Sequence, residues 1–215
     1  MKKHFFAIVA LLGVAFGVWA QEVPATWKKN LTFSSDKLFI FVDGYCGFVN
    51  ISQDTADYIE FPWCDVADTV RLGGSYWVKE MGKSTFLLIN AYYGMGSICV
   101  HTTKKDLKVE ATGICRVDIS PFRTTDTIFD KFPVSYSTVT NNNGVDLTLD
   151  NLTVEAEQNA LVNINPSFRC RGKVELTARD HALISYVGYE ANAHKEETSE
   201  FGLIKGFLNE LSSVR

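Results

Sequence analysis

Three segments of the sequence share one pattern of apolar residues and can be laid over one another. They run from Leu107 to Ile119, from Leu152 to Ile164 and from Val174 to Tyr186. In each segment, apolar side chains occupy three alternate positions, a polar break follows, and a second alternating pair ends the segment. Alternation with a period of two predicts that each of the three segments forms two short strands separated by a turn.

The spacing of these segments predicts how they pack. The second and third begin 22 residues apart, and the first and second begin 45 apart, close to twice that period. A unit of this length is too small to bury its own apolar face, so successive units are expected to stack as coils of a β-solenoid. The sequence therefore predicts an all-β architecture.

Composition agrees with this fold class and narrows the choice of partners. The 215-residue chain is 46% apolar and contains 15 Phe and 8 Tyr, which favours strands and suffices for a core. The formal net charge is −4. A mildly acidic chain argues against nucleic acid as a partner and against an anionic membrane surface.

The first 20 residues have the pattern of a secretory signal peptide. Lys2 and Lys3 precede an apolar run, and small residues around Ala20 suit a cleavage site. The run is shorter than the ~20 apolar residues of a spanning helix. We expect cleavage near Ala20, no membrane span in the mature chain, and export to the periplasm or cell surface.

The remainder divides into three parts. Residues 21–37 are expected to form a polar lead-in segment, residues 38–200 the β-solenoid domain, and residues 201–215 a short helix. The helix is predicted because apolar residues recur there at helical spacing, including Phe201 and Ile204. Because the end of a solenoid exposes its core, this helix is expected to act as a cap.

Glycine occupies one slot between the paired strands. Gly44 and Gly113 lie at matching places, where a positive φ is expected. The later segments carry Gln158 and Asp180 in that slot, which predicts that the turn is reshaped there.

Four short stretches together resemble a known family. They are Phe39-Ile-Phe-Val-Asp-Gly44, Val49-Asn-Ile-Ser-Gln-Asp54, Phe86-Leu-Leu-Ile89 and the segment from Leu107 to Ile119. This succession is similar to the auto-transporter adhesin head GIN domain family, exported proteins common in Bacteroidetes, over residues 38–186. The resemblance implies a right-handed parallel β-helix, an extracytoplasmic location and no catalytic residues. The chain departs from the family pattern at Gln158, at Asp180 and in its five cysteines.

Two of the cysteines fall at matching places in the repeat. Cys46 and Cys115 stand where the later segments have Ala160 and Ala182. Small residues in that slot predict packed, inward-facing thiols, with a disulfide as the alternative.

Aromatic residues in the N-terminal half are the candidates for ligand contact. An exposed cluster would bind a cell-surface glycan or an envelope protein, whereas a buried one would fill the core. The candidate contact residues are Trp63, Trp77, Tyr92 and Tyr93.

Three Asp-Thr-aliphatic triplets are similar to the O-glycosylation site of exported Bacteroides-type proteins. The candidate sites are Thr55, Thr69 and Thr127, and the alternative is that these are turn residues entering strands.

Catalytic and metal-binding motifs are missing from the sequence. There is no His-Glu-x-x-His, no His paired with Cys-x-x-Cys, and no Gly-x-Ser-x-Gly. We therefore expect no metal, no cofactor and no enzymatic activity. The sequence favours an exported adhesin-like or scaffold protein of the cell envelope. The alternative is a carbohydrate-binding or carbohydrate-active β-helix protein.

Overall fold

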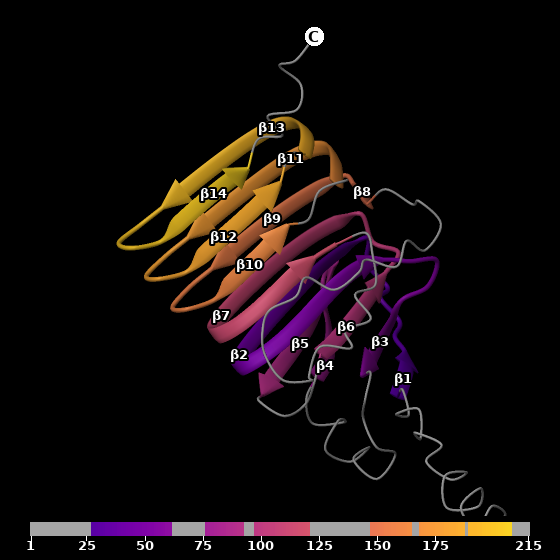
Figure 1. Ribbon diagram of the computed structural model, residues 1–215. Helices are drawn as coiled ribbons and strands as arrows, with labels where there is room; N and C mark the ends of the chain where they lie inside the picture. Colours follow the sequence, from indigo (N-terminus) through magenta and orange to yellow (C-terminus); the bar gives the residue numbers. More distant parts are fainter. Residues whose placement is uncertain are drawn as a thin grey trace, which may run out of the picture.

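The protein is all-β in the computed structural model, which describes residues 27–61, 76–92, 97–120, 147–164, 168–187 and 189–207. Within these ranges there is no helix, and fourteen strands form one curled sheet (Figure 1). The strands are β1 Trp27–Asn30, β2 Lys37–Gln53, β3 Tyr58–Phe61, β4 Tyr76–Met81, β5 Ser84–Tyr92, β6 Ser97–Thr102, β7 Asp106–Ile119, β8 Leu147–Leu149, β9 Asn151–Ala156, β10 Leu161–Ile164, β11 Phe168–Ala178, β12 Leu183–Val187, β13 Tyr189–Thr198 and β14 Leu203–Phe207.

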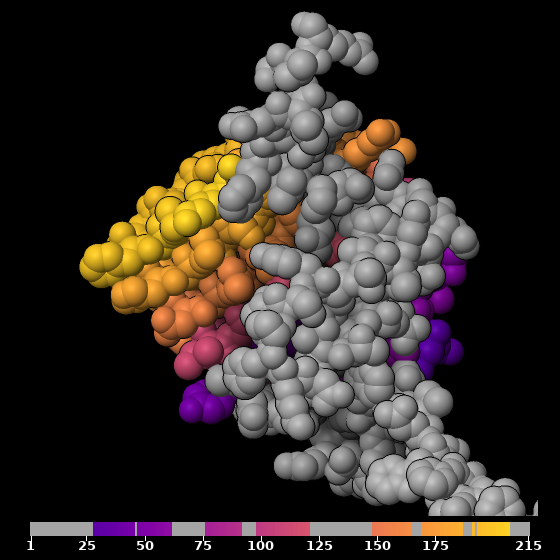
Figure 2. Space-filling view, viewed as in Figure 1, coloured from indigo at the N-terminus to yellow at the C-terminus, as the bar shows by residue number. Residues whose placement is uncertain are grey.

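Most of the sheet is a parallel stack built from the repeat. Strand β7 runs through both halves of one repeat and pairs with β9 through its first half and with β10 through its second. The stack continues from β9 to β11 and β13, and from β10 to β12 and β14. In Figure 2 the turn ends of these strands step upward in chain order, from magenta at β7 to yellow at the C-terminal strands.

The pairing register confirms the superposition of the three segments. Leu107 pairs with Leu152, which pairs with Val174. In the second half, Val162 lies between Val117 and Ile184. Equivalent residues thus form columns at the ~4.8 Å spacing of neighbouring strands.

These columns make the core. Leu38, Leu107, Leu152 and Val174 form one column, and each is at most 1% exposed. Aliphatic columns of this kind exclude water along the whole inner face, which is the main source of the fold's stability.

The turn between the paired strands keeps a positive φ at its central residue but changes in other respects, because β7 runs unbroken through Gly113 whereas turns separate β9 from β10 and β11 from β12. Gly113 has φ +82°, and the matching Gln158 and Asp180 have φ +59° and +54°. The left-handed conformation is therefore retained at a steric cost, because the stacked turn backbones bond to one another. One such bond runs from the Asn159 amide to the Gly113 carbonyl (3.1 Å).

Gly44 has a different role from the one expected. It is not among the residues with positive φ. A Cβ at this position would lie 2.4 Å from the Cys115 Cβ, so glycine is needed for the close approach of β2 and β7.

The prediction of a C-terminal helix is wrong for the part of residues 201–215 that the structure describes. Leu203–Phe207 is strand β14, and Ile204 pairs with Ile184 of β12. This pairing satisfies backbone groups that β12 would otherwise leave open at its edge. Residues 208–215 lie outside the described residues.

The right-handed parallel β-helix is not established by this structure. What the described residues form is a curled sheet resembling half of a barrel (Figure 1), in which the parallel stack is joined to antiparallel strands. Strand β4 pairs antiparallel with β5, and β3 pairs antiparallel with β1 and β6. The expected signal peptide, residues 1–20, lies outside the described residues, and β1 falls within the expected lead-in segment.

Candidate ligand-binding groove

The outer face of β4, β5, β2 and β7 carries two rows of side chains that cross the strands. Pairing registers place four residues in each row. The first row is Lys79, Phe86, Phe39 and Lys108, and the second is Trp77, Leu88, Phe41 and Glu110.

A groove of ≈ 370 Å³ lies along these rows. Its lining residues are Phe39, Ile40, Phe41, Lys79, Met81, Phe86, Leu88, Lys108 and Glu110. The rings of Phe39 and Phe86 stack at a centroid distance of 4.7 Å. Met81 is 53% exposed, and Trp77, in the second row, is 49% exposed. The groove therefore presents apolar surface to solvent.

The sequence builds this surface with uninterrupted apolar runs in β2 and β5. Side chains of a strand alternate between its two faces. In Leu38–Val42, positions 38, 40 and 42 enter the core, so Phe39 and Phe41 must lie outside. Phe86 and Leu88 are placed outside for the same reason. The sequence analysis did not identify these four residues, although a run without polar alternation was the signal for them.

Beyond the groove, the same face is a ladder of ion pairs on β7, β9, β11 and β13. The Lys108 Nζ lies 2.6 Å from Glu110 Oε1 and 2.8 Å from Glu155 Oε1. Partial burial alone would lower the pKa of Lys108, but hydrogen bonds to the two glutamates outweigh it and raise that pKa. Further pairs are Arg179–Glu157, Lys173–Glu175 and Lys195–Glu197.

Two lysines at the groove lack such partners. Among the residues that the structure describes, Lys79 makes no ion pair or hydrogen bond, and Lys37 contacts only the Phe39 ring, at 5.2 Å from its centroid. The groove is thus bordered by cations whose charge is not neutralised by any carboxylate among the described residues.

A second polar cluster surrounds His101 on β6. The His101 Nδ1 lies 3.0 Å from Ser52 Oγ and 3.3 Å from Asp54 Oδ2, and its Nε2 lies 3.4 Å from Glu60 Oε2. The Tyr58 ring stacks on the imidazole at 4.1 Å. The side chains of His101 and Glu60 are 3% and 5% exposed, so a substrate could not reach them.

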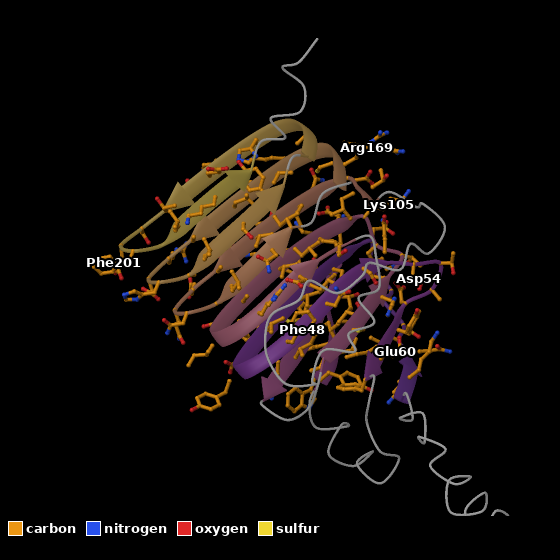
Figure 3. The ribbon with its side chains drawn as sticks, in the orientation of Figure 1. Phe48, Asp54, Glu60, Lys105, Arg169 and Phe201 are labelled. Carbon is orange, nitrogen blue, oxygen red and sulfur yellow. The ribbon has the colours of Figure 1, made fainter. Side chains whose placement is uncertain are left out.

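This cluster ties strands together. Burial alone would raise the pKa of Asp54, but hydrogen bonds from Tyr58 and Thr55 and the nearby His101 together lower it. Figure 3 places Asp54 and Glu60 at the end of the sheet opposite Phe201. The cluster therefore fastens β2, β3 and β6 at that end.

The candidate contact residues are distributed unevenly. Trp77 lies in the second row beside the groove. Tyr92 is the last residue of β5, and its side chain is not described. Trp63 and Tyr93 lie outside the described residues.

Cys115 and Thr55 are the remaining sequence candidates whose side chains are described. Cys115 is a free, buried thiol, and burial is the main reason that its pKa rises to about 11. The side chain of Cys46 is not described. Thr55 is exposed at a bend, where its amide and hydroxyl donate to Asp54. Thr69 and Thr127 lie outside the described residues.

The described residues contain neither a cluster of metal ligands nor a helix suited to a bilayer. Among the described residues, no three His, Cys, Asp or Glu side chains are grouped to hold a metal ion. Within the same ranges, no helix has the length and hydropathy needed to cross a bilayer. Asp118, whose side chain is 5% exposed, is bound by Arg116 at 3.0 Å and by the Asn163 amide at 2.7 Å.

Comparison with known proteins gives no family assignment. No family model matches the chain, and neither does any curated protein. Among solved structures, a "putative adhesin" from Bacteroides fragilis matches at 10% identity, covering 85% of this chain and 96% of that one, with a TM-score of 0.29. A "putative adhesin" from Parabacteroides merdae matches at 10% identity, with coverages of 85% and 95% and a TM-score of 0.28.

A third structure, a "putative lipid binding protein" from Parabacteroides distasonis, matches at 12% identity, with coverages of 85% and 96% and a TM-score of 0.30. Scores of this size do not establish a shared fold. The function of this chain must therefore be inferred from its own surfaces, and membership of the head GIN domain family stays a prediction.

Proposed function

We propose that this protein is an exported, non-catalytic, adhesin-like binding protein of the cell envelope that contacts its ligand through the groove on β2, β4 and β5. One observation carries the proposal. An apolar surface is open to solvent on a sheet face whose other half is covered by ion pairs. Exposed apolar surface of this kind is typical of interaction sites.

The burial and the hydrogen bonds of the polar side chains support the proposal that the protein is not an enzyme. An acid or base must reach its substrate within hydrogen-bond distance. His101 and Glu60 are buried, and Asp118 is held by Arg116 and Asn163. These groups stabilise the sheet.

Export and the finer fold assignment belong to the same proposal. The basic and apolar start of the chain supports export. The in-register parallel stack of β7, β9, β11 and β13 supports a right-handed parallel β-helix of the kind that the head GIN resemblance implies.

The experiment that tests the contact face compares two outer-face variants. Beads coated with the mature protein are mixed with bacterial envelope fractions and with epithelial cells, and retention is measured. In the test variant, Phe39→Thr and Phe86→Thr remove apolar lining but keep strand propensity. In the control, Glu175→Thr changes the same row on β11, outside the groove.

We expect retention to fall about tenfold or more in the double variant, because hot-spot aromatics dominate the affinity of such surfaces. The control should keep its retention. Equal retention by the double variant and the control would reject the groove as the contact face.

A carbohydrate-binding role is the second candidate, and the exposure of Trp77 favours it. A half-exposed indole on the outer sheet face offers one surface on which a sugar ring can stack. A glycan array probed with the protein and with Trp77→Ala tests this role. Saturable binding lost in the variant would support it, and no binding to any glycan would exclude it.

A further inference from the structure

We infer that the groove binds the acyl chain of an anionic amphiphile, with the anionic headgroup beside Lys79. This inference rests on the proposed function, because it names the ligand class of the same contact face. It follows from the shape of the groove, the orientation of its rings and the charges at its border.

The shape of the groove suits an extended flexible chain. Its two rows are two residues apart along each strand, which separates them by ~7 Å. Each row crosses four strands, from Lys79 and Trp77 on β4 to Lys108 and Glu110 on β7, a span of ~14 Å. A long and narrow apolar channel matches a single hydrocarbon chain better than it matches a compact ring.

The rings of the lining leave little flat surface for a sugar. Phe39 and Phe86 turn one face toward each other, with an interplanar angle of 10°. The ammonium groups of Lys37 and Lys108 lie 5.2 Å and 5.9 Å from the Phe39 centroid. A ligand beside Phe39 therefore meets the edge of that ring and the aliphatic side chains of Met81 and Leu88 along the groove. These contacts stabilise methylene groups, and they do not provide the polar partners that sugar hydroxyls require.

The charges of the face specify the headgroup. Lys108 is neutralised by Glu110 and Glu155, and Lys173 of β11 and Lys195 of β13 are each paired with a glutamate. Lys79 borders the groove without a described carboxylate partner. An anionic headgroup at this end would complete the pattern of paired charges while its chain lies along Phe86 and Phe39.

The first test measures binding of octanoate, decanoate, dodecanoate and hexadecanoate to the mature protein by titration calorimetry. Affinity should rise between about twofold and fourfold for each added methylene, because the groove is open and buries each group partly. The rise should stop once the chain is longer than the groove. The double variant Phe39→Thr and Phe86→Thr should lose this dependence on chain length.

The second test isolates the headgroup. Lys79→Gln should weaken decanoate binding about threefold, the effect of removing an exposed charge pair. It should leave the binding of uncharged 1-decanol unchanged. The matched control is Lys195→Gln, which removes a lysine of the same row on β13, beyond the groove, and should change neither affinity.

The inference is overturned if no fatty acid binds, or if the double variant binds decanoate as well as the natural protein does. Circular dichroism and thermal melts establish that each variant is folded, and 1-decanol binding keeps Lys79→Gln informative. If fatty acids do not bind while bead retention still depends on Phe39 and Phe86, the ligand class is wrong and the proposed function stands.

Discussion

The groove region on β2, β4 and β5 and the ladder region on β9, β11 and β13 are two parts of one sheet with the same inner face and different outer faces. Inward, the column through Leu38 and Leu107 continues into Leu152 and Val174. Outward, the row through Phe39 continues into Thr153 and Glu175. The inner columns maintain the fold in both regions, so the outer face is free to differ, and its apolar half is where binding is proposed.

The last strand of the ladder region differs from its neighbours on the inner face as well. His194, Glu196 and Thr198 of β13 pair with Val174, Leu176 and Ala178. Glu196 accepts hydrogen bonds from the Tyr186 hydroxyl at 2.7 Å. Burial and this glutamate raise the pKa of Tyr186 to about 12. Polar residues therefore replace the aliphatic columns where the stack ends, which discourages another chain from adding to the edge.

The largest expected effect tests whether the inner faces are equivalent. Leu38→Ala in the groove region and Leu152→Ala in the ladder region should each lower the free energy of unfolding by about 3 kcal/mol, because each opens a cavity in the same buried column. Urea denaturation measures both. If Leu38→Ala lowers the free energy of unfolding by less than half as much as Leu152→Ala does, the inner faces of the two regions are not equivalent.

The next effect distinguishes the turns of the two regions. Gly113→Ala should cost about 2 to 3 kcal/mol, because φ is +82° and the new Cβ would lie 2.3 Å from the Gly44 carbonyl oxygen. Gln158→Ala at the matching turn should change stability by less than about 0.5 kcal/mol, because a side chain already occupies that conformation. Similar costs for both variants, measured by thermal unfolding, would contradict this distinction.

A pH-dependent effect should separate Cys115 from the alanines that occupy the matching slot in the ladder region. The thiol pKa is about 11 in the folded protein against 9.0 in the unfolded chain. Its contribution is therefore fully present below pH 9 and is lost as the pH rises toward 11. Between pH 8 and pH 10, the natural protein should lose about 1 kcal/mol relative to Cys115→Ala in urea denaturation. If the free energies of unfolding of the two proteins change with pH in parallel, the Cys115 thiol does not cause the loss of stability.

The smallest effect is a gain in stability in the ladder region. Glu200 has φ +56° without being glycine, so Glu200→Gly should raise the free energy of unfolding by about 0.5 kcal/mol. Asp180→Gly should gain less, because the Asp180 carboxylate accepts a hydrogen bond from the Gln158 amide. Differential scanning calorimetry of both variants checks this order, and a loss of stability in Glu200→Gly would contradict it.

Sequence patterns predicted the parallel register but missed the fourth unit of the repeat. The inner positions of β13 hold polar residues such as His194 and Glu196, so the apolar alternation that identified the other units is interrupted there. Helical spacing of Phe201 and Ile204 then favoured a helix. The strand forms because β12 has an edge that is otherwise unpaired, and local periodicity does not report this tertiary contact.

Of the four candidate contact residues, Trp77 is the one whose side chain is described, and it lies in the row beside the groove. The groove residues Phe39 and Phe86 are 47 positions apart in the chain, and they meet because β2 and β5 pair in parallel register. The local sequence pattern of either strand does not specify the register in which β2 and β5 pair. The buried His101 cluster was missed for the same reason, since its partners come from β2, β3 and the bend between them.

The sequence by itself determined the all-β class and the stacking of its repeats, because a period of two places each apolar column on one face and equal spacing aligns the columns. Tertiary structure decided where the parallel stack meets antiparallel strands, which aromatic residues remain exposed, and which lysines have no carboxylate partner within the described ranges. The physical reason is that the inner columns are specified by local alternation, whereas pairing on the outer face depends on which strands become neighbours.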